Sequence, residues 1–131
     1  MTKLHKRLGY SVEESITGHI NELKDDAVGL WQIVPKGHDG FSLEGEELVD
    51  FIRRHIVALL KAGAKPVYSV YSGLDSEYLW TLTSKYGETT EEITEAIISE
   101  WKEKGCKDPE FDSIWFALPN IYKEKKPNQQ K

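Results

Sequence analysis

His38 and Asp39 stand side by side between two glycines in the segment GLWQIVPKGHDG, which spans residues 29–40. The pair has the residue types of two metal ligands, or of a general base with the carboxylate that orients it. Adjacent side chains seldom point at one ion, and no second histidine-rich segment follows at ligand spacing. The alternative is a glycine-flanked turn in which Asp39 hydrogen-bonds to its own backbone. We favour the turn, and we predict neither a metal site nor a catalytic pair.

His55 is a second candidate for chemistry, because it lies within the apolar stripe of a predicted helix. Phe51, Ile52 and Leu59 flank it at helical spacing, so its imidazole is expected to be partly buried. A buried neutral histidine that a backbone carbonyl holds is commoner than a catalytic one. His19, at the edge of an earlier helix, has the same two interpretations. An enzyme that uses His38, Asp39 or His55 therefore stays open as an alternative.

Other catalytic signatures are missing from the sequence. It contains no P-loop, no G-x-G-x-x-G fingerprint and no G-x-S-x-G elbow. The carboxylate pairs Glu91/Glu95 and Glu46/Asp50 are expected on exposed helix faces, where both members stay ionised. General acid catalysis needs one neutral carboxyl. We therefore predict a non-enzymatic protein with no catalytic residue and no cofactor.

The composition indicates one folded, acidic domain. The 131 residues are 39% hydrophobic, and 17 Lys and Arg face 22 Asp and Glu, for a net charge of −5. That balance argues against general affinity for nucleic acid. No stretch is long and apolar enough to span a membrane. Cys106 is the only cysteine, which suits a reducing compartment, so we expect a cytoplasmic protein.

Two helices carry capping boxes, in which a side chain at each end of the first turn satisfies a backbone amide. Ser11 with Glu14 predicts a helix from about Val12, and Thr89 with Glu92 predicts one that Gly105 ends. Between them, residues 48–60 carry a broad apolar stripe, and this helix is expected to take Ser42 as its cap and to end at Gly63.

The remaining apolar runs predict strands. AVGLWQIV (27–34) indicates a buried strand that Pro35 ends, and residues 36–40 follow as a turn. VYSVY (67–71) and YLWTLTSKY (78–86) flank the loop SGLDSE and predict a hairpin towards one side of the sheet. SIWFALP (113–119) is the last strand.

This order predicts an α+β fold: an N-terminal helix, then β-α-β-β-α-β, in a four-stranded, mainly antiparallel sheet covered by helices. The pattern matches a ferredoxin-like arrangement. We expect a flexible N-terminus over 1–10, a single domain over 11–119, and a disordered lysine-rich tail over 120–131.

Acidic clusters with nearby tyrosines indicate a surface for a basic protein partner. The candidate partner-binding residues are Glu44, Glu46, Glu47, Asp50, Tyr71, Asp75, Glu77, Tyr78, Tyr86, Glu91, Glu92 and Glu95. The leading hypothesis is protein binding, with an immunity protein that neutralises a basic toxin domain as the specific case. The alternative from another class is a small-molecule-binding or regulatory domain. The sequence leaves the oligomeric state open.

Three segments resemble a family of small uncharacterised bacterial proteins, a domain of unknown function. They are KAGAKPV, YLWTLTSKYGETTEEITEAIISEW and DPEFDSIWFALP, and the resemblance spans the chain from Leu30 to Pro119. Since these strings coincide with caps, strands and core positions, they imply a shared fold more than a shared chemistry. Some members are associated with toxin–immunity loci, and the resemblance assigns no catalytic residue.

Overall fold

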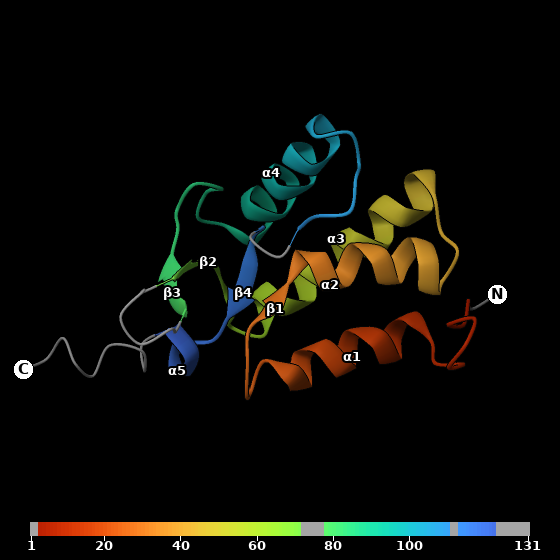
Figure 1. Ribbon diagram of the computed structural model, residues 1–131, viewed down its shortest axis with the longest axis horizontal. Helices are drawn as coiled ribbons and strands as arrows, with labels where there is room; N and C mark the ends of the chain where they lie inside the picture. The colour runs from red at the N-terminus through yellow and green to blue at the C-terminus, as the bar shows by residue number, and fades with distance from the viewer. Residues whose placement is uncertain (1–2, 72–77, 111–112, 123–131) are drawn as a thin grey trace, which may run out of the picture.

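The computed structural model describes residues 3–71, 78–110 and 113–122. This part of the chain forms an α+β fold with five α-helices and a four-stranded antiparallel sheet (Figure 1). The elements are α1 (Val12–Glu22), β1 (Val28–Gly29), α2 (Leu30–Pro35), the π-helical turn η1 (Lys36–Gly40), α3 (Gly45–Lys61), β2 (Lys65–Tyr71), β3 (Tyr78–Leu82), α4 (Thr90–Glu103), β4 (Trp115–Ala117) and α5 (Pro119–Tyr122).

The sheet has the order β1-β4-β2-β3, and every neighbouring pair is antiparallel. Val67 of β2 lies opposite Trp115 of β4 and opposite Leu82 of β3. The hairpin β2–β3 and the position of β3 at one edge confirm the sequence prediction. The connecting loop, residues 72–77, lies outside the described residues.

The ferredoxin-like prediction is wrong in strand order. In a ferredoxin-like sheet the third strand lies between the first two, whereas here β4 lies between β1 and β2, and β2 lies between β3 and β4. The helical connections still join strands that are not neighbours. β4 separates β1 from β2, and β2 separates β3 from β4; each separating strand is antiparallel to the two beside it. β1 is only two residues long and pairs with β4 alone, which leaves it at the edge of the sheet.

The prediction of a strand over residues 27–34 is also wrong, because most of this run is helical. Leu30, Ile33 and Val34 are buried at the i, i+3, i+4 spacing of one helix face. The Gln32 side chain accepts a hydrogen bond of 2.7 Å from the Gly29 amide at the start of α2. A short apolar run does not distinguish a buried strand from a buried helix, and here packing against α3 selects the helix.

The predicted helix caps are largely confirmed. Both capping boxes form, with Ser11 before α1 and Thr89 before α4. Gly63 and Gly105 follow α3 and α4 with φ of 105° and 90°, the left-handed region that glycine tolerates best. Ser42 is not a cap. Its own φ is 59°, and the cap position of α3 belongs to Glu44, whose side chain makes no capping hydrogen bond.

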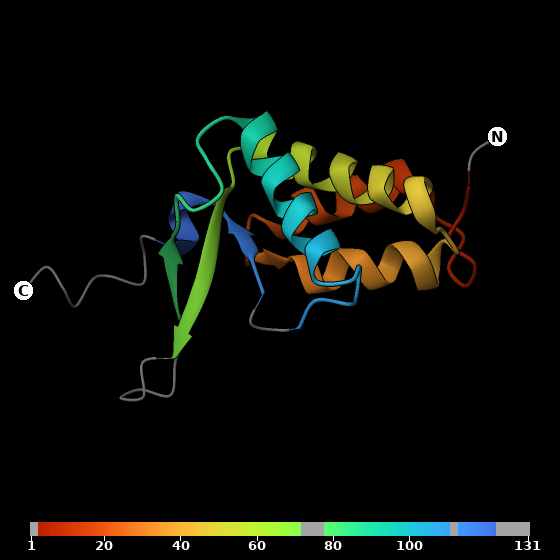
Figure 2. The same cartoon turned by 90° about the horizontal axis from the view of Figure 1, so that it is seen from above.

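The apolar core lies mainly between the sheet and the helices α1 to α4, while α5 packs on the other face (Figure 2). Successive strand residues alternate between these faces. Phe116 belongs to the large cluster under the helices, and its neighbours Trp115 and Ala117 belong to a smaller cluster with Tyr122 of α5. The short helix α5 was not predicted from the sequence, and residues 123–131 lie outside the described part of the chain.

The segment before α1 packs against η1, which the sequence did not predict. The Lys6 amide donates to the Gly40 carbonyl at 2.9 Å, and the buried His5 ring lies 5.6 Å from the Phe41 ring. A methyl group at Gly40 would lie 2.7 Å from the His5 ring. Glycine therefore permits the close approach of the N-terminal segment to this turn.

Candidate functional site

The described residues form a hollow of about 520 Å³, which we call the α4 hollow. Its walls come from the C-terminal half of α4, from β2 and the segment after β3, and from residues 107–110 and 113–114. These segments are distant in the sequence and meet because β4 inserts beside β2 in the sheet. The α4 hollow is thus a product of the tertiary fold.

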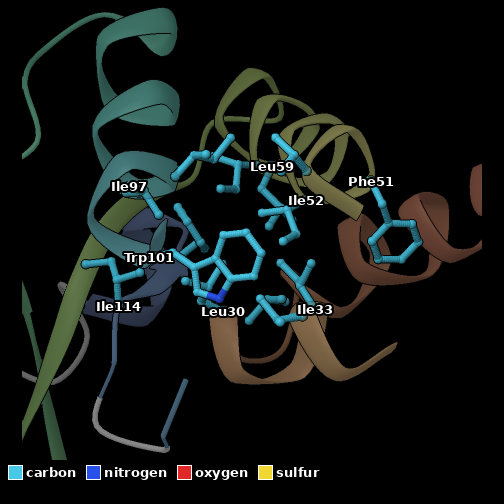
Figure 3. Packing of buried hydrophobic residues seen from close by; sticks show 14 of the residues in the cluster. Leu30, Ile33, Phe51, Ile52, Leu59, Ile97, Trp101 and Ile114 are labelled. Atoms are coloured by element: carbon cyan, nitrogen blue, oxygen red, sulfur yellow. The ribbon is translucent and has the colours of Figure 1, made fainter. Parts of the chain in front are cut away.

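The floor of the α4 hollow is apolar. Leu30, Ile97 and Ile114 line it, together with Trp101, whose indole extends from α4 towards Leu30 (Figure 3). Trp101 Nε1 donates a hydrogen bond of 2.8 Å to the Lys107 carbonyl. This bond orients the ring and ties the segment after α4 to the helix, so the floor is preformed.

One wall holds a hydrogen-bonded group of three side chains. The Tyr86 hydroxyl donates to Glu100 Oε1 at 2.7 Å, and Lys85 Nζ lies 2.8 Å from Glu100 Oε2. Burial and the hydrogen bond to Glu100 raise the pKa of Tyr86. Burial of the Glu100 carboxyl opposes its ionisation, but the bonds from Lys85 and Tyr86 outweigh that effect and lower its pKa. Both oxygens of Glu100 are therefore occupied, and Lys85 is neutralised.

The rim of the α4 hollow carries further charges. Asp108 is bonded to His38, whereas Lys104, Lys107 and Glu110 form no ion pair with any residue that the structure describes. Ser113 adds a buried hydroxyl oxygen that has no hydrogen-bond partner among the described residues. A buried hydroxyl without a partner is costly. The α4 hollow thus offers one unused hydroxyl group beside an apolar floor.

His38 and Asp39 do not act as a pair in this structure. His38 Nε2 lies 2.5 Å from Asp108 Oδ1, while the Asp39 carboxylate lies 3.5 Å from Lys6 Nζ and 3.6 Å from an Arg7 nitrogen. They lie in the π-helical turn η1 rather than in a simple loop. The predicted turn is present, but the Asp39 side chain bonds to the N-terminal segment, where the prediction expected a bond to its own backbone.

His55 is fully buried, and its hydrogen bonds define its protonation. The Phe51 carbonyl accepts from Nδ1 at 2.9 Å, so Nε2 accepts from the Ser15 hydroxyl, also at 2.9 Å. Burial lowers the pKa of His55 to about 3, against the opposing effect of the Phe51 bond. The predicted carbonyl partner is confirmed. No substrate reaches this imidazole, because the side chain has no exposed surface.

His19 belongs to the same buried polar group. Its ring lies 5.5 Å from the His55 ring, Nδ1 lies 2.9 Å from Glu22 Oε1, and Nε2 lies 2.9 Å from Lys36 Nζ. A lysine ammonium only donates, so Nε2 accepts and Nδ1 donates to Glu22. Burial and the nearby Lys36 charge lower the pKa of His19 to about 4. This group of side chains joins α1, α3 and η1 and serves packing.

The predicted acidic residues divide between separate places. Glu46, Glu47 and Asp50 of α3 line a second hollow of about 460 Å³, together with Glu13 at the start of α1. Lys3 and Arg54 also line it, and Arg54 pairs with Glu13 at 2.9 Å. We call this feature the acidic hollow. Glu44 is exposed at the cap position just before α3.

The acidic residues of α4 have local roles. The Glu92 side chain closes the capping box, and Glu95 accepts hydrogen bonds of 2.7 and 3.0 Å from Arg53. Glu91 is exposed, and Tyr86 lines the α4 hollow. Asp75 and Glu77 lie outside the described residues, as do the side chains of Tyr71 and Tyr78. The twelve candidates therefore do not form one demonstrated face.

The described residues contain neither a metal-binding cluster nor a helix that could span a membrane. No group of three or more His, Cys, Asp or Glu side chains there is arranged to hold a metal ion. None of the helices in residues 3–71, 78–110 and 113–122 is long and apolar enough to cross a membrane.

Comparison with protein-family models, curated proteins and solved structures finds no match for this chain. The resemblance to a family of small bacterial proteins therefore stays a prediction.

Sequence reasoning missed most of the α4 hollow and the buried partner of His55. The spacing of Val12, Ser15 and His19 places all three on one helix face, so the sequence could have predicted that Ser15 is buried. Residues such as Thr83, Lys104 and Ser113 carry no pattern in the sequence that joins them. They meet only through the strand order.

Proposed function

We propose that this protein is a small-molecule-binding or regulatory domain whose ligand occupies the α4 hollow. The single observation that carries the proposal is the combination of an apolar, aromatic floor with a few placed polar groups in one hollow of about 520 Å³. Ligand sites in proteins are typically concave, mostly apolar and about 300–1,000 Å³ in volume. The bonds of Trp101 and of Tyr86 hold the walls in place before any ligand arrives.

The α4 hollow supports binding better than catalysis. Its most buried carboxylate, Glu100, has both oxygens engaged and a lowered pKa, so it does not serve as a proton donor near neutral pH. Tyr86 has a raised pKa, so it keeps its proton and donates a hydrogen bond to Glu100. His38 reaches the rim only through Asp108. A non-enzymatic role fits these bonded groups.

A fluorescence titration tests the proposal with N-phenyl-1-naphthylamine, a neutral aromatic probe that brightens in apolar sites. We expect saturable binding at one site, and we expect Thr83→Trp to abolish it, because Thr83 lines the α4 hollow and an indole there fills the space. Leu82→Trp is the matched control, since Leu82 is exposed and does not line the hollow. Circular dichroism checks that both variants fold. If Thr83→Trp and the unaltered protein bind the probe equally, the α4 hollow is not the binding site.

A second candidate function is binding of a basic protein partner, including a toxin domain, at the acidic hollow. The observation that favours it is the gathering of Glu13, Glu46, Glu47 and Asp50 around one concavity, with two cationic residues. Negative patches accelerate encounter with positive partners. Affinity capture from the source cell compares the unaltered protein with a variant that carries Glu46→Lys and Glu47→Lys. Recovery of one basic protein by the unaltered chain alone supports this function, and identical recovery by both chains contradicts it.

A further inference from the structure

We infer that the outer edge of β3 is an interaction surface for a second copy of this chain, whose own β3 pairs with it as an antiparallel strand. The inference does not depend on the α4 hollow, because it concerns the edge of the sheet. It comes from three properties of β3: its outward backbone groups, the residue types that it carries, and the register in which two copies match.

The outer edge of β3 presents backbone groups that have no strand beside them among the described residues. β3 is the last strand in the order β1-β4-β2-β3, and Figure 2 shows it beyond β2. The Thr83 amide donates to the Pro66 carbonyl at 3.2 Å. In an antiparallel pair, residues that bond to the partner strand alternate with residues that do not. Thr81 therefore bonds to β2, whereas the amides of Trp80 and Leu82 point outward.

β3 also carries none of the features that usually keep a free edge strand from pairing with another chain. Such strands are very short, or contain charged residues, proline or a bulge. The sequence of β3 is YLWTL, and its pairing with β2 is continuous over all five residues. Leu82 keeps 47% of its surface exposed. The opposite edge differs, because β1 is only two residues long. β3 is thus the edge that stays open to pairing.

Two copies of β3 match when the two-fold axis passes through Trp80. Antiparallel pairing then sets Trp80 opposite Trp80 of the second copy, and Leu82 opposite Tyr78 of the second copy. Backbone groups at these alternate positions all point outward, so each of these pairs exchanges two hydrogen bonds. No residue of the strand is charged, so no like charges lie opposite each other. A two-fold contact of this kind uses the same surface on both copies and closes as a dimer.

Sedimentation velocity of the full chain over a dilution series tests the inference. A reductant is present, because the exposed Cys106 would otherwise be able to join two copies through a disulfide. We expect the mass to rise with concentration from 15.0 kDa to twice that value. A monomer at every concentration overturns the inference and leaves the edge to a strand of another protein.

Two substitutions at Leu82 test whether β3 forms the contact. Leu82→Pro removes one outward amide and leaves the bonds to β2 in place, and Leu82→Lys adds a charge of the kind that protects natural edge strands. Each should weaken the dimer about tenfold or more. Leu8→Lys is the matched control, because Leu8 is 72% exposed and lies outside the sheet, and this variant should form the dimer as the unaltered chain does. Circular dichroism checks that the variants fold.

Hydrogen exchange of single amides tests the register without any substitution. The Trp80 and Leu82 amides should exchange about tenfold more slowly in the dimer than in the dilute monomer, because a hydrogen bond to the second copy protects them. The Thr81 amide is the internal control, since its bond to β2 protects it at every concentration. A dimer in which Trp80 and Leu82 exchange as fast as in the monomer, or one that neither Leu82 variant weakens, overturns the pairing through β3.

Discussion

His38 Nε2 lies 2.5 Å from Asp108 Oδ1, across 70 positions of sequence. The bond joins the π-helical turn η1 to the segment that follows α4, and Asp108 lines the α4 hollow. His38 is thus bonded to the rim of the α4 hollow and does not itself line it. Its neighbour Asp39 instead binds the N-terminal segment through Lys6 and Arg7.

The His38–Asp108 bond is expected to contribute little to global stability, because both side chains are largely exposed. A double-mutant cycle with His38→Ala and Asp108→Ala should give a coupling free energy of about 0.2–1 kcal/mol in urea unfolding at low salt. A coupling that is several times larger contradicts this description of an exposed pair.

The Ser15–His55 bond is expected to matter far more, because both groups are buried. Ser15→Ala removes the donor to His55 Nε2 and leaves that nitrogen unsatisfied in the core. The free energy of unfolding should fall by about 1–3 kcal/mol. Ser99→Ala is the matched control on the exposed surface of α4 and should change it by less than about 0.5 kcal/mol. Equal stability of the two variants would show that the buried bond is not made in solution.

Acidification should destabilise the protein between pH 6.5 and 5. The pKa values of His19 and His55 are lowered from 6.5 to about 4 and about 3, so in this range the unfolded chain binds protons that the folded protein does not. The two histidines contribute their full stabilisation above pH 6.5, the pKa of histidine in the unfolded chain. Below that pH the free energy of unfolding falls by up to about 1.4 kcal/mol per pH unit for each histidine.

Urea unfolding at several pH values measures this slope, and His19→Gln should reduce it by about half because one of the two histidines is removed. The window lies above the ordinary pKa of the carboxyl groups, whose protonation adds its own loss at lower pH. Stability that stays constant from pH 7 to 5 would contradict the burial of two neutral imidazoles.

Two glycine-to-alanine substitutions should change the stability of the protein in opposite directions. Gly40→Ala places a methyl group 2.7 Å from the His5 ring and should cost about 1–3 kcal/mol as the N-terminal segment is displaced. Gly18→Ala lies in α1, where an added methyl group meets nothing within 4 Å, and should stabilise by about 0.5–1 kcal/mol. Thermal unfolding separates the two outcomes. A neutral Gly40→Ala would mean that residues 3–10 are not docked on η1.

Local signals in the sequence predicted much of the fold. The capping boxes at Ser11 and Thr89 were found because their side chains bond within one turn. The hairpin was found because its two strands are joined by a short loop. The strand order was not found, since the insertion of β4 between β1 and β2 depends on contacts between residues far apart in sequence.

The candidate sites were predicted less well for the same reason. Sequence reasoning correctly anticipated that His55 is buried against a backbone carbonyl, because both groups lie on one helix. It did not identify Asp108 as the partner of His38, nor Ser113 as part of a hollow, because nothing local links them. Residues 27–34 are apolar at nearly every position, so the helical spacing of the buried residues Leu30, Ile33 and Val34 does not stand out in the sequence.

The central claim is that the α4 hollow binds a small ligand, and amide chemical shifts test it most directly. Titration of the ¹⁵N-labelled full-length protein with 1-anilinonaphthalene-8-sulfonate should move the amide signals of Thr83, Lys104 and Ser113 together, along one saturation curve. Signals of Glu46 and Asp50 at the acidic hollow should stay in place. Shifts confined to the acidic hollow, or no saturable shift at Thr83, Lys104 and Ser113, would contradict the assignment of the α4 hollow as the binding site.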